Sequence, residues 1–154
     1  MVVRQAKKLS DAYIEYKVNG KITWDSPLLF VVIRITDQIE KEYIPELSTF
    51  SSFCPDQLIT RLKEKFAGEE INWSRIMILY LFCALIAKGK SENEIFQLKK
   101  YTGEFAIERF GDWISENGGW ESFVFFNADV FPVEESTTEI IKYDCSCFCS
   151  YRNV

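Results

Sequence analysis

The stretch Asn72–Ala87, NWSRIMILYLFCALIA, decides the fold. Asn72 is a favoured helix N-cap, and Lys88-Gly89 is a typical helix end. The 12 residues from Ile76 to Ala87 are apolar on every side of the helix that they would form, which is typical of a helix packed on all faces. They are too few to span a bilayer, which needs roughly 20 residues. The sequence therefore predicts a buried central helix.

The chain after the central helix carries further helix signals. Ser91 and Glu94 form a capping box, which predicts a helix running to about Phe110. Two short helical pieces are then expected, around Trp113-Ile114 and from Trp120 to Phe126, separated by the Asn117–Gly119 turn.

Two more helices are expected on the N-terminal side of the central helix. Pro55 begins one with Leu58, Leu62 and Phe66 on one stripe and an end at Gly68. Ser26-Pro27 begins the other, because serine caps a helix and proline is tolerated at its first position. The β-branched run in residues 28–33 favours a strand, but Val32, Ile35, Ile39 and Tyr43 recur at helical spacing and the length favours a helix. Pro45 is expected to end it.

The first segment fits two structures by local rules. Residues 15–24 alternate in polarity around Asn19-Gly20, which is a hairpin signal. Alternatively, Ser10 caps a helix through Tyr13, Ile14 and Val18 that ends at Gly20. With the helix, at least six helices surround the central one in a single domain, residues 1–154.

Composition excludes several classes of function. The chain has 154 residues, a net charge of −5 and no histidine. The negative net charge argues against nucleic-acid binding. Without histidine, the chain cannot form Ser-His-Asp or Cys-His catalytic sites or most catalytic zinc sites. The sequence has no pair of carboxylates at a spacing that would indicate an enzyme, and we expect no cofactor. Five cysteines, three of them crowded at Cys145, Cys147 and Cys149, indicate a reducing compartment rather than a disulfide framework.

Arg75 is the one local misfit in the central stretch. A cation in the first turn of a helix is slightly unfavourable against the helix dipole. Near Asn72 and an apolar stripe, it is well placed to bind a carboxylate of another molecule. An ordinary surface arginine is the alternative.

Two segments resemble a known family. Residues 72–76, NWSRI, are similar to the first homology motif of the Bcl-2 apoptosis regulators, which reads Asn-Trp-Gly-Arg-Ile or Val. Residues 113–124, WISENGGWESFV, resemble the second motif, in the expected order. Residues 9–17, LSDAYIEYK, resemble the first helix of survival-promoting members, which favours the helix over the hairpin. The resemblance covers about residues 9–127 and leaves residues 128–154 as a tail.

The resemblance implies an all-α bundle around a central apolar helix, with a surface hydrophobic groove. Such a groove receives the amphipathic death-motif helix of pro-apoptotic proteins. The implied function is an apoptosis inhibitor without catalysis. A pore-forming killer of the same family and a helical adaptor for other amphipathic helices are the alternatives. A homodimer is left open.

The resemblance also implies roles for individual residues. Arg75 would pair with the ligand's aspartate, Asn72 would hydrogen-bond beside it, and Ser74 would lie against the ligand helix. The matching pocket positions are Ile39, Tyr43, Leu47, Leu58, Leu62, Phe66 and Phe82, for each of which plain core packing is the alternative. The motifs also contain residues with a structural role: Trp73, Trp113, Gly118, Gly119 and Trp120.

Departures from the family pattern refine this expectation. Ser74 replaces glycine where the ligand comes close to the backbone, and residues 36–39 only weakly echo the family's own death motif. The compact chain, the short link between its first helices and the lack of a hydrophobic anchor after Asn127 look like a virus-encoded homologue. A cytoplasmic location, or a peripheral one at mitochondria, follows. The tail cysteines are expected to be reduced and solvated; palmitoylation and metal binding are the weaker alternatives.

Overall fold

The computed structural model describes residues 1–68 and 70–127, and the regular secondary structure of these ranges is all α-helix. The cysteines of the tail lie outside the described residues. The six helices are α1 (Val2–Asn19), α2 (Pro27–Phe50), α3 (Pro55–Phe66), α4 (Trp73–Ala87), α5 (Glu92–Glu116) and α6 (Gly119–Phe126).

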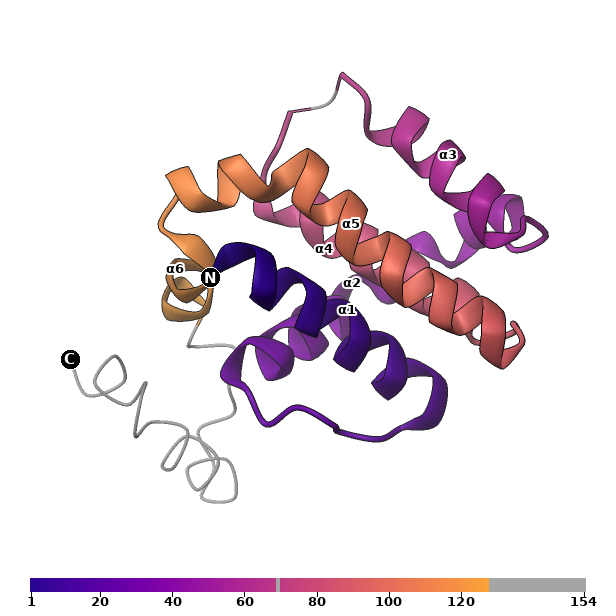
Figure 1. The fold of residues 1–154 in the computed structure, drawn as a ribbon, viewed down its shortest axis with the longest axis horizontal. Helices are drawn as coiled ribbons and strands as arrows, with labels where there is room; N and C mark the ends of the chain where they lie inside the picture. Colours follow the sequence, from indigo (N-terminus) through magenta and orange to yellow (C-terminus); the bar gives the residue numbers. More distant parts are fainter. Residues whose placement is uncertain (69, 128–154) are drawn as a thin grey trace.

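The predicted central helix is α4. Every residue from Ile76 to Ala87 is buried except Leu85, which is half-buried. α1, α2 and α5 all pack against α4, and α5 also packs against α1 and α3. Figure 1 shows α1 and α3 on opposite sides of α5, with α6 near the chain's N-terminus. The all-α prediction is thus confirmed, with the apolar helix at its centre.

The first segment is helical, and its hairpin alternative does not form. Gly20 ends α1 in the left-handed conformation with φ 68°, as predicted. Ser10 as the N-cap is wrong, because the helix begins at Val2. Ser10 lies buried inside α1 and its hydroxyl donates to the Ala6 carbonyl at 3.2 Å. The apolar face continues upstream of Ser10, with Ala6 buried, and this burial extends the helix.

Pro45 does not end the second helix, contrary to the prediction. Ser26 caps α2 as expected, accepting from the Leu28 N–H at 3.2 Å, but the helix continues through the proline to Phe50. Proline removes one backbone donor from the helix. Beyond it, Leu47 and Phe50 pack against the core, so burial keeps the segment helical.

α5 also runs further than predicted. Its capping box is present, but it ends at Glu116 instead of near Phe110 and includes Trp113 and Ile114. Ile114 is fully buried and Trp113 packs on Trp73, so core contacts join the two expected pieces into one helix. Five helices therefore surround α4 in the described ranges, rather than six or more.

Candidate helix-binding site

The N-terminus of α4 carries the polar part of the candidate site. Asn72 is extended, with φ −156°, and its Oδ1 accepts from the Arg75 backbone N–H at 2.9 Å. This bond satisfies one of the amide donors left free at a helix start. It fixes Ser74, which is exposed, and Arg75, which is half-buried, on the first turn.

An aromatic cluster packs around Trp73 on this first turn of α4. The Trp73 ring lies 5.1 Å from Trp113, 5.6 Å from Trp120 and 4.6 Å from Phe123, measured between ring centroids. Trp120 is fully buried, and its indole N–H donates to the Val2 carbonyl at 3.2 Å. The tryptophans of the two motifs therefore join the starts of α1, α4 and α6.

Two glycines form the turn at the start of α6: Gly118 is its N-cap and Gly119 its first residue. Gly118 has φ 94° and Gly119 has φ 75°, both in the left-handed region that glycine adopts without strain. This turn positions Trp120 beneath α4 and explains why two successive glycines occur here.

The apolar positions fall into two groups. Ile39, Tyr43 and Leu47 follow one face of α2 at helical spacing and are half-buried. The others are almost completely buried: Leu58, Leu62, Phe66 and Phe82. Without a ligand, the second group belongs to the core.

The structure brings some of these side chains together and separates others. Tyr43 contacts Phe82 edge to face, with ring centroids 5.7 Å apart. Phe66 instead packs on Phe105 and Phe110 of α5, at 6.2 and 6.1 Å. The candidate site thus has its floor at Phe82, with Phe66 turned toward α5.

Sequence reasoning missed three residues around Phe82. Phe50 lies 5.7 Å from the Phe82 ring, and the Lys65 ammonium lies 5.6 Å from its centroid. Lys65 also pairs with Glu46 at 3.0 Å. Phe50 continues the stripe of Tyr43 and would have been found had Pro45 not been taken as a helix end. No sequence signal distinguishes Lys65 from Lys63, the other lysine of α3.

Ion pairs tie α1 to the helices around it. Lys17 bonds Glu40 at 2.6 Å and lies 3.7 Å from Asp37. Lys99 of α5 pairs with Glu15 at 2.8 Å. Hydrogen bonds from Lys99 and Asn19 lower the pKa of the Glu15 carboxyl. These pairs hold α2 and α5 against α1.

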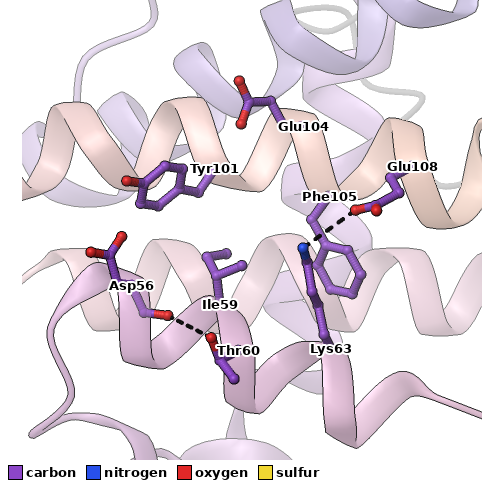
Figure 2. A pocket seen from close by; sticks show the side chains of 8 residues that line it. All are labelled: Asp56, Ile59, Thr60, Lys63, Tyr101, Glu104, Phe105 and Glu108. Atoms are coloured by element: carbon purple, nitrogen blue, oxygen red, sulfur yellow. Dashed lines mark hydrogen bonds and ion pairs between the residues drawn. The ribbon is translucent and has the colours of Figure 1, made fainter.

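A cavity of about 420 Å³ lies between α3 and α5, apart from the predicted site residues. Figure 2 shows Lys63 reaching Glu108 across it, at 3.4 Å, and the Thr60 hydroxyl bonded to the Asp56 carbonyl. A hydrogen bond to the Asp56 carboxylate raises the pKa of Tyr101. A second cavity, of about 450 Å³, is lined by Phe96, lysines and carboxylates of α1 and α5.

The described ranges contain neither a metal-binding cluster nor a membrane-spanning helix. No set of three or more cysteine, aspartate or glutamate side chains there is grouped to hold a metal ion. Within the same part of the chain, no helix has the length and hydropathy needed to cross a membrane.

Comparisons with known proteins show which proteins the chain is similar to. The sequence profile described as apoptosis regulator proteins, Bcl-2 family, matches residues 32–120. The chain is 25% identical to Bcl-2-related protein A1 of Bos taurus, with 74% of this chain and 75% of the relative covered. It is 22% identical to the anti-apoptotic protein NR13 of Gallus gallus, with 77% and 73% covered.

Solved structures share the fold. The zebrafish pro-survival protein NRZ without ligand superposes with a TM-score of 0.65 at 19% identity, covering 83% of this chain and 94% of that one. The complex of NRZ with the Bad BH3 segment gives a TM-score of 0.67 at 20% identity, covering 81% and 93%.

Proposed function

The chain belongs to the Bcl-2 family of apoptosis regulators, and we propose that it inhibits apoptosis by sequestering the death-motif helices of pro-apoptotic proteins. The ligand helix would lie in a groove bordered by α2, α3 and the N-terminus of α4. The observation that carries the proposal is the turn held by the Asn72 cap, which places the half-buried Arg75 on the first turn of α4, the helix against which α2 packs. NRZ, which shares the fold, has been solved with a Bad BH3 segment, and this supports the same binding mode.

Each part of the groove has a chemical role in this proposal. Arg75 forms a charge-assisted hydrogen bond with an aspartate of the ligand, and Asn72 and Ser74 lie beside that pair. Ile39, Tyr43 and Leu47 contact the ligand's apolar anchors at i, i+3 or i+4 and i+7. Binding opens the groove further, so that anchors reach the buried positions Leu58, Leu62, Phe66 and Phe82. No step requires catalysis.

The chain's own echo of a death motif supports a survival factor over a killer. Thr36 is fully buried and accepts a hydrogen bond from the Tyr13 hydroxyl at 2.6 Å. Asp37 of the same segment and Glu40, which directly follows it, both face Lys17. Presenting this segment to another molecule would break all of these contacts and expose buried side chains of α2.

A binding panel tests the proposal. Synthetic death-motif peptides, labelled with a fluorophore, are titrated with the purified chain and followed by anisotropy. We expect at least one peptide to bind with micromolar or tighter affinity, and the same peptide with its anchors changed to alanine to lose binding. Flat titrations with every peptide would refute the proposal, since the adaptor and enzyme alternatives predict them.

Three further expectations concern the cell. We infer a virus-encoded origin, a cytoplasmic location or a peripheral one at mitochondria, and leave the homodimer open. Fractionation of cells that express the tagged chain tests the location, and sedimentation of the purified chain tests the dimer.

A further inference from the structure

The Phe82 ring, at the floor of the candidate groove, is covered from three directions. Tyr43 and Phe50 of α2 each lie 5.7 Å from it, between ring centroids. Lys65 of α3 places its ammonium 5.6 Å from the same ring. As a result Phe82 has no exposed surface in the ligand-free protein. An incoming anchor can touch it only after one of these covers has moved.

Of the three side chains over Phe82, Lys65 is the one that connects α2 and α3, the two helices at the sides of the candidate groove. Its Nζ donates to Glu46 Oε2 at 3.0 Å, which joins α3 to the part of α2 that follows Pro45. Its side chain is 23% exposed and that of Glu46 is 45% exposed, so the pair lies at the surface with the ammonium turned inward. One ammonium thus makes an ion pair and a cation–π contact at once.

Lys63 of the same helix provides an internal comparison. It pairs with Glu108 of α5 at 3.4 Å, and both side chains are at least half exposed. It borders the cavity between α3 and α5 rather than Phe82. Lys63 and Lys65 therefore carry the same charge on the same helix, but of the two only Lys65 covers the Phe82 ring.

We propose that Lys65 and Glu46 form a latch that closes the groove over Phe82, and that the latch opposes ligand entry. The inference rests on the proposed function, because it concerns the same groove. A ligand anchor that occupies the space over Phe82 displaces the ammonium from the ring and from Glu46. An exposed ion pair and a cation–π contact each correspond to a factor of about two to five in an equilibrium constant. The latch therefore lowers the apparent affinity for ligands and disfavours those with weak anchors.

Binding to latch variants is the first test. The tightest peptide of the panel is titrated into the wild-type chain and into Lys65→Ala and Glu46→Gln variants. We expect Glu46→Gln, which removes only the ion pair, to bind about two- to fivefold more tightly, and Lys65→Ala, which removes both contacts, about four- to 25-fold more tightly, mainly through faster association. Lys65→Arg keeps the charge and both contacts, and should stay within about twofold of the wild type. Lys63→Ala is the matched control, with the same loss of charge on α3, and should also remain near the wild-type affinity.

Two binding results would overturn the latch. One is unchanged or weaker binding by both Lys65→Ala and Glu46→Gln while circular dichroism shows an intact fold. The other is an equal gain in Lys63→Ala, which would indicate a general effect of charge.

A measurement on the ligand-free chain separates the latch from the proposed function. Methylene protons of a lysine held over an aromatic ring shift upfield in the NMR spectrum. We expect those of Lys65 to lie upfield of those of Lys63, and to move back in Glu46→Gln. Equal shifts for the two lysines in the wild type would refute the latch. If the upfield shift is present but no peptide binds, the closed contact of Lys65 over Phe82 stands, whereas the proposed function fails and with it the role of that contact in ligand entry.

Discussion

At the scale of single residues, Arg75 is the side chain on which the binding proposal depends most. The Asn72 cap holds its backbone N–H at the start of α4, so the position of its backbone is fixed. We expect Arg75→Ala to weaken binding of every bound peptide by about 1.5–3 kcal/mol, roughly 10- to 150-fold, as for a hydrogen bond between charged groups. Anisotropy titration measures the loss, and urea unfolding shows whether the fold is unchanged.

Arg61→Ala is the matched control for this prediction. Arg61 is exposed on α3 and pairs with Glu64 at 3.5 Å, so its removal changes the net charge equally. A loss below about tenfold in Arg75→Ala, or an equal loss in Arg61→Ala, would show that Arg75 does not pair with the ligand's aspartate.

Ser74 is expected to narrow the choice of ligand. It is exposed on the first turn of α4, where the family has glycine, and its side chain adds two heavy atoms to a close contact. Ser74→Gly should broaden the set of bound peptides, with weak binders gaining more than strong ones. The peptide panel measures this, and Ser115→Gly, at an exposed helical position, is the control. A uniform shift of all affinities with the same ranking would contradict the prediction.

The two glycines at the start of α6 should differ in their tolerance of alanine. A Cβ at Gly118 would lie 2.6 Å from the Ser122 Cβ, whereas one at Gly119 would lie 2.8 Å from Glu121 Oε1, the end of a flexible side chain. Both have positive φ, which is strained for alanine. Gly118→Ala should destabilise the chain by about 2–4 kcal/mol and Gly119→Ala by about 1–2 kcal/mol. Urea unfolding measures both, and equal losses would contradict the clash argument.

At the scale of elements, Trp120 joins α6 to the rest of the bundle. It is fully buried, contacts Trp73 and Tyr80, and bonds the Val2 carbonyl at the start of α1. Trp120→Ala should lower the free energy of unfolding by about 3–5 kcal/mol, as truncations of large buried aromatics do. Trp120→Phe removes the indole N–H with less loss of volume and should be milder.

Unfolding and binding together test the role of Trp120. Thermal melts and peptide titrations are run on the same variants. If the melting temperature were unchanged while the affinity fell, Trp120 would be a binding hot spot and not a core residue.

At the scale of the whole molecule, buried tyrosine and cysteine side chains make the fold sensitive to alkaline pH, at which they would lose a proton. Burial raises the pKa of Tyr13 and Tyr80 above their ordinary values, and raises that of the Cys83 thiol to about 12. A pKa raised by folding gives stability that is complete below the unfolded value and is lost as the pH rises through the folded value. We therefore expect the free energy of unfolding to fall from about pH 9 upward, by about 1.4 kcal/mol per pH unit for each group above its unfolded pKa.

Tyr80→Phe isolates one contribution to this alkaline loss. The Tyr80 hydroxyl donates to the Ala6 carbonyl at 3.1 Å, so its removal should cost about 1 kcal/mol at pH 8. Above pH 10 the variant should lose stability less steeply than the wild type, because one buried ionisation is gone. Urea unfolding between pH 8 and 12 measures both slopes, and parallel curves would contradict the assignment.

Helix starts and ends could be read from the sequence wherever neighbouring residues determine them. Asn72, Ser26 with Pro27, and the Ser91–Glu94 box begin helices in the structure, and Gly20 ends one. Each of these signals involves a few consecutive residues and backbone groups within one turn, so no distant contact is needed. The family motifs at residues 72–76 and 113–124 are likewise local, and they led to the all-α fold and to Arg75.

Only the tertiary structure decided where distant side chains override these local rules. α2 passes through Pro45 because Leu47 and Phe50 pack on the core, and Ser10 lies inside α1 because the apolar face continues to Ala6. The latch between Lys65 and Glu46 joins residues that no spacing rule connects, since they lie on different helices. Burial of apolar area and contacts between helices outweigh a lost backbone hydrogen bond or a weak helix propensity. Both the burial and the contacts depend on residues far apart in the chain, so they cannot be calculated from residues adjacent in sequence.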